Sequence, residues 1–232
     1  MKTFADNLDV YKILLAAAHI NNCVVSAHNY LKTAFKGTLY GNSLSILEFV
    51  KLTMCNENSM KLMIINYKRT IFVICDYKKR NSLRSKYLRR RKLIPYYMQH
   101  NAKLYRDLRH YMHLVRPFVE KALNIENTQK IKFIGFKEGA ALASVLAFDF
   151  SVYNINNSIQ PKVCLCAIQS SSPGNQALQS AILHAIDHTL SFNVYLQPSK
   201  MPWPNAIKYY MDHKICCFCN YNSYDVLDFC LS

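Results

Sequence analysis

The segment with the most chemical potential covers residues 132–144 and reads Lys-Phe-Ile-Gly-Phe-Lys-Glu-Gly-Ala-Ala-Leu-Ala-Ser. It has the form of an apolar strand, a tight turn between Gly135 and Gly139, and a helix that begins with small residues. Lys137 stands at the centre of the turn, and Glu138 follows it. The two side chains could act as an acid/base pair, but solvation or mutual pairing is the expected state of such neighbours.

This turn resembles the nucleophile elbow of class 3 lipases. In that family two glycines let a strained turn pack against the sheet and lift the central side chain. The spacing of Gly135 and Gly139 and the Ala-Leu-Ala run after them carry the resemblance. The family has its nucleophilic serine at the centre, whereas this chain has Lys137, which has no hydroxyl group to acylate. The resemblance implies an α/β-hydrolase fold with its nucleophile replaced.

The other catalytic roles of the family also fall on unsuitable residues. Residues 163–177, with their Ser-Pro-Gly-Asn run, are similar to the family's next strand and loop. Beyond them, the resemblance puts Gln197 at the acidic triad position and Val226 at the histidine position. A neutral amide cannot stabilise an imidazolium as a carboxylate does. Residues 76–78 read Asp-Tyr-Lys where the family has the Arg-Gly-Thr segment of its oxyanion hole, so we expect no lipase activity.

The C-terminal region contains one histidine and four cysteines that could be assembled into a zinc site. We nevertheless expect no metal and no cofactor. The five residues are His213, Cys216, Cys217, Cys219 and Cys230.

Hydrophobic spacing predicts a helix-rich N-terminal part. Apolar residues recur at helical spacing over residues 8–35, as one long or two short helices, and Ser43 can cap a further helix over residues 44–52. The β-branched runs 61–67 and 70–76 predict two strands.

The rest of the chain alternates between helix and strand. A long apolar stripe predicts a helix over residues 96–123. After it we expect strands over 131–134, 163–168 and 192–196, separated by helices over 138–150 and 175–188. Such alternation indicates a mainly parallel sheet in a helix-rich, degenerate α/β-hydrolase domain. We predict one domain over residues 1–232, with a helical N-terminal segment, 1–58, and a lipase-like core, 59–232.

Charge is strongly biased, because 29 Lys and Arg residues exceed 14 Asp and Glu residues and give a formal net charge of +15. The densest basic stretch covers residues 78–92 and ends in Arg89, Arg90, Arg91 and Lys92. It could be a nuclear import signal or a polyanion contact, or only the exposed face of a basic helix. Neither a signal peptide nor a membrane span is expected.

Two further features of composition favour contacts between protein surfaces. The chain has 16 tyrosines, and tyrosine gives contact area and a hydrogen bond at small entropic cost. Its nine cysteines are odd in number, so some could pair between chains. The candidate disulfide cysteines are Cys23, Cys55, Cys219 and Cys230.

Taken together, these features are similar to the occlusion-body proteins, or polyhedrins, of nuclear-replicating insect DNA viruses, and to the nudivirus type in particular. The resemblance implies a self-assembling lattice that forms in the host nucleus, encases virions, persists outside the host and dissolves at alkaline pH. Its partners are then other copies of the chain and virions, and nucleic acid is a less favoured partner.

Three other functions stay open. A pseudo-lipase binding module would hold a lipid, a membrane or a protein in the old acyl groove. An enzyme with altered catalytic residues would need a nucleophile that the sequence does not reveal. A nucleic-acid binder would use residues 78–92 and lose affinity steeply with salt.

Overall fold

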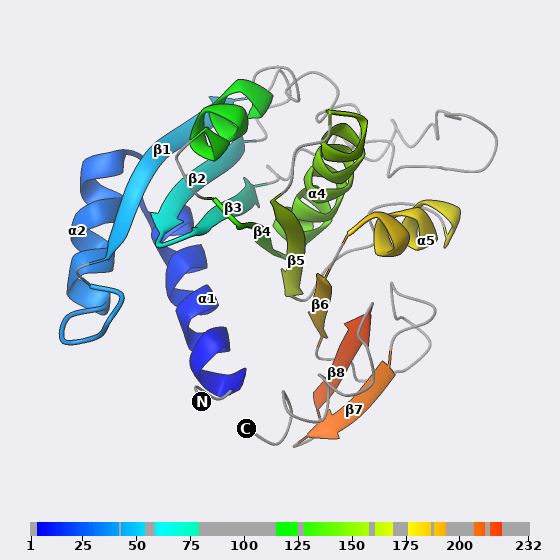
Figure 1. The fold of residues 1–232 in the computed structure, drawn as a ribbon. Helices are drawn as coiled ribbons and strands as arrows, with labels where there is room; N and C mark the ends of the chain where they lie inside the picture. Colours follow the sequence, from blue (N-terminus) through cyan, green and yellow to red (C-terminus); the bar gives the residue numbers. More distant parts are fainter. Residues whose placement is uncertain are drawn as a thin grey trace, which may run out of the picture.

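A mixed sheet of eight strands runs through the part of the chain that the structure describes, in the order β1-β2-β3-β4-β5-β6-β8-β7 (Figure 1). The computed structural model describes residues 4–41, 43–53, 59–78, 115–124, 128–157, 161–168, 176–186, 188–193, 207–211 and 214–219. The strands are β1 (Leu44–Thr53), β2 (Ser59–Tyr67), β3 (Thr70–Lys78), β4 (Lys130–Phe136), β5 (Lys162–Ile168), β6 (His188–Asn193), β7 (Ile207–Met211) and β8 (Lys214–Cys219). The helices are α1 (Phe4–Ile20), α2 (Val24–Ala34), α4 (Glu138–Asn157) and α5 (Gln176–Ala185), and residues 115–123 are also helical.

Only the centre of the sheet is parallel. Strands β3, β4, β5 and β6 run in the same direction, whereas β1, β2, β7 and β8 pair with their neighbours in antiparallel fashion. The prediction of a mainly parallel sheet is therefore wrong for the two flanks. The reason is local, since β2 and β3 are joined by the tight turn at Lys68 and Arg69, which has no room for a crossover helix.

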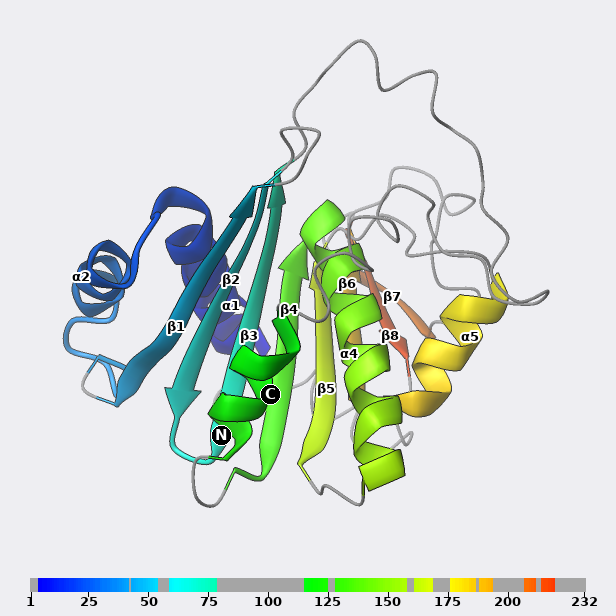
Figure 2. The ribbon, with the colours of Figure 1, turned by 90° about the horizontal axis from the view of Figure 1, so that it is seen from above.

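Helices cover both faces of this sheet (Figure 2). On one face α1 packs on β2, β3 and β4, and α2 packs on β1. On the other face α4 packs on β3, β4 and β5, and it also contacts α5. Because both faces are covered, the central strands are apolar almost throughout.

The core next to α4 explains the small residues of that helix. Ala140, Ala141, Ala143 and Ala147 are all buried against the sheet, where short side chains let the helix backbone approach closely. Phe133 on β4 fills the space beneath, with its ring 6.0 Å from that of Phe150. Burying such a ring stabilises the fold by about 1.5–3 kcal/mol.

The helix predicted over residues 44–52 is strand β1, so the N-terminal segment 1–58 is not wholly helical. Its register shifts between Ile46 and Glu48, which leaves Leu47 in a β-bulge. Leu44, Leu47 and Val50 are therefore apolar at intervals of three although they lie in a strand. Both faces of β1 carry apolar residues, so the usual alternation of a strand is lost.

Most other elements agree with their predictions. Residues 8–35 form two helices, and the predicted strands and helices from 61–76 and 131–188 correspond to β2, β3, β4, α4, β5 and α5. Strand β6 begins at His188, four residues before the predicted start at 192. Of the predicted helix over 96–123, the structure describes only the end, from residue 115, which is helical. Strands β7 and β8 were not predicted.

Candidate functional site

The turn between β4 and α4 places Lys137 in a strained backbone conformation at the end of the central sheet. Its φ angle is 51°, in the left-handed region that a residue with a side chain rarely adopts. The Lys137 amide donates to the carbonyl of Ile168, at the end of β5, over 2.9 Å. Its own carbonyl accepts from the amide of Ala140 over 3.1 Å and so begins the helix. The predicted sharp turn is therefore present, with Lys137 at its apex.

Two glycines make this turn possible by close approach rather than by their own φ angles. A Cβ atom on Gly135 would lie 2.2 Å from the carbonyl oxygen of Gly139, which is a direct clash. A Cβ atom on Gly139 would lie 2.5 Å from the carbonyl oxygen of Cys75 on β3. The first glycine thus lets α4 start against β4, and the second lets it start against β3.

The Lys137 side chain is exposed and lies against an aromatic ring. Its Nζ atom is 5.1 Å from the centre of the Phe136 ring, within the range of a cation–π contact. Phe136 itself is 42% exposed, although it is a large apolar side chain. Glu138 is also exposed, and its charge is favourable in the first turn of α4. A cation and an aromatic ring, both accessible, therefore occupy the apex of the turn.

A polar cluster lies beside the turn at the end of β3. The Cα atom of Asp76 would be 3.4 Å from a Cβ atom on Gly139, so this acidic residue borders the turn directly. An Asp76 carboxylate oxygen is 3.2 Å from Nδ1 of His19, at the end of α1. Lys61 is directly opposite Asp76 in the ladder between β2 and β3, and it is only 8% exposed. Its ammonium group donates to the carbonyls of His19, at 2.6 Å, and Asn21, at 2.8 Å.

This cluster was missed in the sequence because its members are far apart. His19 precedes Asp76 by 57 residues, and Lys61 reaches back 42 residues to the carbonyl of His19. Together they fix the end of α1, where free carbonyl groups favour a cation. The backbone of Asp76 borders the turn, while its carboxylate contacts His19 at the end of α1.

The buried cysteines near the turn are not prepared for nucleophilic attack. Burial raises the pKa of the Cys166 thiol to about 12, and it raises the pKa of the Cys75 thiol still further. Both therefore stay protonated at neutral pH. Cys23 differs, because it is exposed, and a hydrogen bond with Ser26 lowers the pKa of its thiol.

The remaining predicted site residues are mostly outside the described part of the chain. Gln197 and Val226, proposed as triad positions, lie there, as do the basic run Arg89, Arg90, Arg91 and Lys92 and the cysteines Cys55 and Cys230. Cys219 is the last residue of β8. Cys23, the fourth disulfide candidate, is a free thiol in the monomer, as are Cys75, Cys164 and Cys166.

Cys216 and Cys219 have the two-residue separation found in many structural zinc sites. Both lie in strand β8, where Cα atoms three residues apart are separated by about 10 Å. A zinc knuckle needs a turn at this spacing, so the backbone here does not suit one. Within the described residues no group of three or more potential metal ligands is found.

Two small hollows are found in the described part of the molecule. One lies between α2 and the start of β1, lined by Leu31, Tyr40 and Leu44 among others. The second lies between helical residues 115–123 and α4, next to Val119 and Phe150. Each has room for about one water molecule, and neither borders Lys137. None of the described helices is long and apolar enough to cross a membrane.

Comparison with known proteins shows a lipase-like fold. No protein-family model matches the sequence, and no curated protein matches it. Among solved structures, a lipase from Rhizopus microsporus var. chinensis is similar, with a TM-score of 0.63 and 14% identity over 94% of this chain and 78% of the lipase. A triacylglycerol lipase from Penicillium expansum has a TM-score of 0.58 and 15% identity over 93% and 82%.

A mono- and diacylglycerol lipase from Aspergillus oryzae is similar as well, with a TM-score of 0.57 and 13% identity over 94% of this chain and 91% of that enzyme. The chain therefore has a lipase-like α/β fold, as its sequence predicts. Identities this low show the fold alone.

Proposed function

We propose that this protein keeps the lipase fold without the lipase reaction and that it serves as a self-assembling structural protein. The observation that carries the first half is Lys137 at the apex of the turn between β4 and α4. An acyl-transfer nucleophile at this apex needs a hydroxyl or thiol group and an adjacent base. Lysine at the apex offers neither a hydroxyl nor a thiol.

The surroundings of Lys137 support the same proposal. Residues 76–78 read Asp-Tyr-Lys at the position that the lipase resemblance gives to the Arg-Gly-Thr segment of the oxyanion hole. The resemblance also gives the acidic and histidine roles to Gln197 and Val226, which cannot perform them. The oxyanion hole, the acidic residue and the histidine of the lipase reaction would therefore all be absent.

Hydrolysis is tested by treating the folded protein with a serine-directed fluorophosphonate probe and with a short-chain p-nitrophenyl ester. We expect neither labelling nor turnover above the rate of a heat-denatured sample. Covalent labelling of the native protein, lost on denaturation, would show a working serine nucleophile and overturn this half of the proposal.

The proposed structural role rests on the composition and on the surface. Sixteen tyrosines and nine cysteines offer many lateral contacts and possible cross-links for a chain of 232 residues. Exposed apolar side chains lie around the turn between α1 and α2, where Ile20 and Val25 are each more than 60% exposed. The two hollows found among the described residues are each too small for an acyl chain. These features favour packing against other copies over binding of a lipid.

In its specific form, the proposal is a viral occlusion-body protein of the polyhedrin type. Copies would assemble in the host nucleus, enclose virions and leave the host as particles that dissolve in alkali. Tyrosine and lysine side chains titrate near pH 10, so raising the pH would remove cations and create phenolates at the contacts. Disulfides between copies, for example at the exposed Cys23, would add resistance until they are reduced.

Expression in insect cells provides the test of self-assembly. Particles would be examined by electron microscopy and powder diffraction before and after exposure to a pH of about 11, with and without a reductant. We expect crystalline particles that dissolve on alkalinisation, and faster when reduced. A protein that stays soluble and monomeric throughout would overturn the structural role.

One observation favours a second candidate, a binding module. Phe136 and Lys137 form an exposed aromatic and cationic pair at the apex, which could hold an anionic partner. This candidate predicts a soluble monomer or small oligomer in the same expression experiment. Its affinity for a fatty-acid carboxylate should fall in the Phe136→Ala and Lys137→Ala variants.

A further inference from the structure

Four basic residues gather at the end of the sheet opposite to Lys137. Lys68 and Arg69 form the turn between β2 and β3, Lys130 is the first residue of β4, and Lys162 is the first residue of β5. All four are exposed. We call this set the basic edge. It is distinct from the basic stretch 78–92.

Backbone hydrogen bonds hold the basic edge together. The amides of Gln129 and Lys130 both donate to the carbonyl of Arg69, over 2.9 and 3.2 Å. The amide of Lys162 donates in turn to the carbonyl of Gln129 over 2.9 Å. Three segments that are distant in the sequence thus present their cations in one row, with adjacent strands about 4.8 Å apart.

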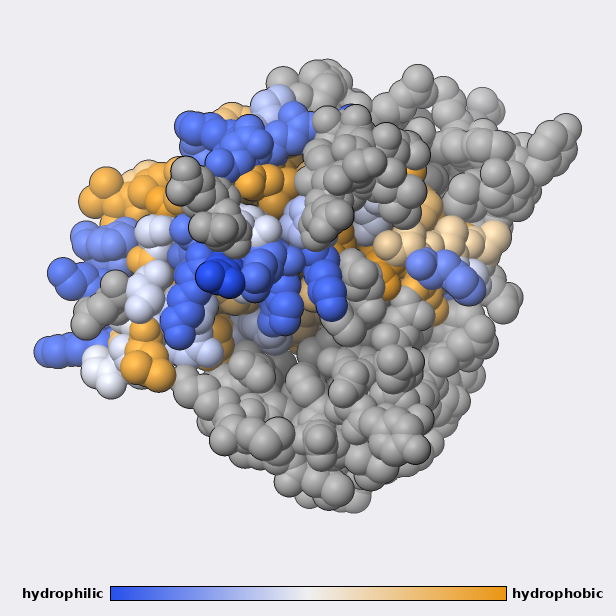
Figure 3. All heavy atoms as spheres, in the orientation of Figure 1, coloured by the Kyte–Doolittle hydropathy of each residue, from blue (hydrophilic) through white to orange (hydrophobic). Residues whose placement is uncertain are grey.

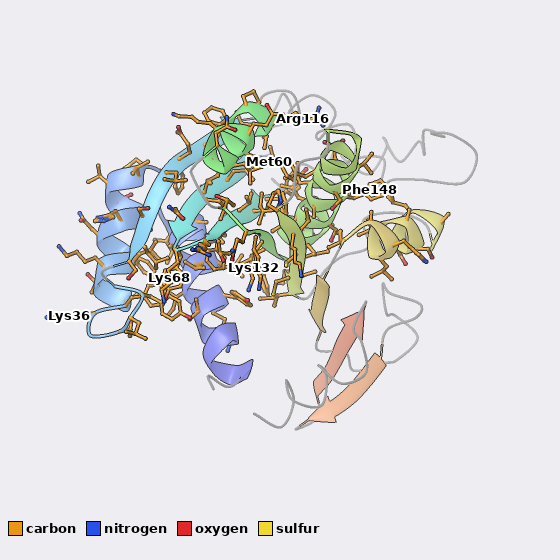
Figure 4. All side chains as sticks on the ribbon, viewed as in Figure 1. Lys36, Met60, Lys68, Arg116, Lys132 and Phe148 are labelled. Carbon is orange, nitrogen blue, oxygen red and sulfur yellow. The ribbon has the colours of Figure 1, made fainter. Side chains whose placement is uncertain are left out.

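Two of these cations face each other. Lys130 and Lys162 are direct partners in the parallel ladder between β4 and β5, so their side chains leave the sheet on the same face. Like charges in such positions repel, and folding gains nothing from this arrangement. Lys132, which is labelled in Figure 4, lies two residues along the same face of β4. It is different, since its ammonium group lies 3.3 Å from the Tyr11 hydroxyl and near the Phe72 ring.

Acidic side chains do not compensate the basic edge within the described part of the chain. The ion pairs found there are at other places, namely His19 with Asp76, Arg116 with Asp149 and Glu120, and Lys121 with Glu48. Lys68 has only a cation–π contact, with its Nζ atom 5.3 Å from the Tyr67 ring centre. Figure 3 shows hydrophilic residues gathered across the middle of this side of the molecule.

From this geometry we propose that the basic edge binds the phosphate backbone of double-stranded nucleic acid without reading its sequence. A row of exposed cations that has no acidic partner among the described residues is complementary in charge to a row of phosphates. Lysine is a point-charge phosphate ligand, and lysine supplies three of the four cations.

Duplex rather than single-stranded nucleic acid fits the edge better. Single strands are usually held by aromatic rings on which bases stack. Among the side chains that the structure describes, the exposed ring of Phe136 lies at the opposite end of β4. Tyr67, beside Lys68, is only partly exposed and packs against Tyr40. This inference does not depend on the proposed self-assembly, since a soluble monomer would present the same edge.

The test compares two double variants that remove the same charge. Lys130→Gln with Lys162→Gln changes the basic edge, and Lys36→Gln with Lys51→Gln removes two exposed lysines elsewhere. Binding to a fluorescent duplex of arbitrary sequence is measured by anisotropy between about 0.05 and 0.2 M salt. Each lost phosphate contact should lower the slope of log affinity against log salt by about 0.9, so the edge variant should lose nearly two. The control should keep the original slope within experimental error.

Several results would overturn the proposal. One is a wild-type protein that does not bind the duplex at the lowest salt. Another is an equal slope of log affinity against log salt for the two double variants. A further variant changes Arg89, Arg90, Arg91 and Lys92 to Gln. Adding the Lys130→Gln and Lys162→Gln changes to it must still lower the slope of log affinity against log salt by nearly two. Tight binding of poly-glutamate without binding of the duplex would point instead to an acidic protein partner. Matching thermal unfolding of both double variants shows that any difference in binding is not a folding defect.

Discussion

Lys61 on β2 and Asp76 on β3 are directly opposite each other, and both bind the last turn of α1. The ammonium group of Lys61 satisfies two carbonyls there, while the carboxylate of Asp76 contacts His19. A buried lysine is costly unless it is paired and hydrogen-bonded. This one is retained because the end of a helix supplies the acceptors.

Replacing Lys61 should therefore loosen α1. In Lys61→Met the carbonyls of His19 and Asn21 lose their donor while remaining partly buried, which should lower the free energy of unfolding by about 1–3 kcal/mol. The control is Lys51→Met on β1, since Lys51 is exposed and is the cross-strand neighbour of Lys61. It should change stability by less than about 0.5 kcal/mol in urea unfolding. Equal effects of the two changes would contradict the role given to Lys61.

Gly139 should tolerate no side chain. In Gly139→Ala the new methyl group meets the carbonyl of Cys75 at 2.5 Å, and backbone cannot move aside as a flexible side chain can. We expect a loss of about 1–3 kcal/mol in the free energy of unfolding, or failure to fold.

Gly37 supplies the control for this glycine. Nothing lies within 4 Å of a Cβ atom there, but its φ angle is +78°. Gly37→Ala should cost only the strain of a left-handed residue, about 1 kcal/mol. A Gly139 variant as stable as the Gly37 variant would show that α4 can shift away from β3.

Alkali should destabilise the folded chain through its buried thiols. Burial raises the pKa of Cys166 from 9.0 to about 12, so the unfolded chain loses this proton first as the pH rises. The protonated Cys166 thiol therefore contributes fully to the free energy of unfolding below a pH of about 9. This contribution is lost as the pH rises to about 12, at about 1.4 kcal/mol per pH unit. Cys75 acts in the same direction, because burial also raises the pKa of its thiol.

The measurement is urea unfolding at several pH values between about 8 and 11. Cys166→Ala should be less stable at pH 8 because of the lost packing, yet its stability should fall less steeply with pH. Ile168→Val, a buried truncation on the same strand, should keep the slope of the wild type. Parallel slopes for all three proteins would contradict the assignment.

Cys23 should react faster than the three buried cysteines Cys75, Cys164 and Cys166. It is exposed, and a hydrogen bond with Ser26 lowers its thiol pKa, whereas Cys75, Cys164 and Cys166 are buried. A thiol reagent such as DTNB should modify it rapidly in the native protein. In Cys23→Ser the rapid phase should lose one equivalent, and in Cys166→Ala it should lose none. The opposite pattern would mean that the core opens faster than the surface thiol reacts.

Local sequence determined the turn at Lys137 and most of the elements around it. Gly135, Gly139 and the small residues after them predict a strand, a sharp turn and a closely packed helix, because such contacts depend on residues near in sequence. The continuous apolar runs of β2 and β3 likewise identify buried strands. The sequence also shows that a lysine, Lys137, stands at the centre of that turn.

The prediction from sequence failed where the same apolar spacing fits both a helix and a strand. Residues 44–52 have apolar side chains at intervals of three because a bulge and two covered faces remove the alternation of β1. Strands β7 and β8 are short, and within the described sheet β8 pairs with β6 and β7. Hydrophobic period alone cannot separate such segments from helix or loop.

Tertiary structure alone decided which charges meet. The chain gives no sign that Lys61, Asp76 and His19 belong together, or that Lys68 and Arg69 share an edge with Lys130 and Lys162. Both groups arise from strand register, which brings residues separated by tens of positions to within one or two strand spacings. Side-chain type fixes what each charge can do, and the register of the sheet fixes which other charges it meets.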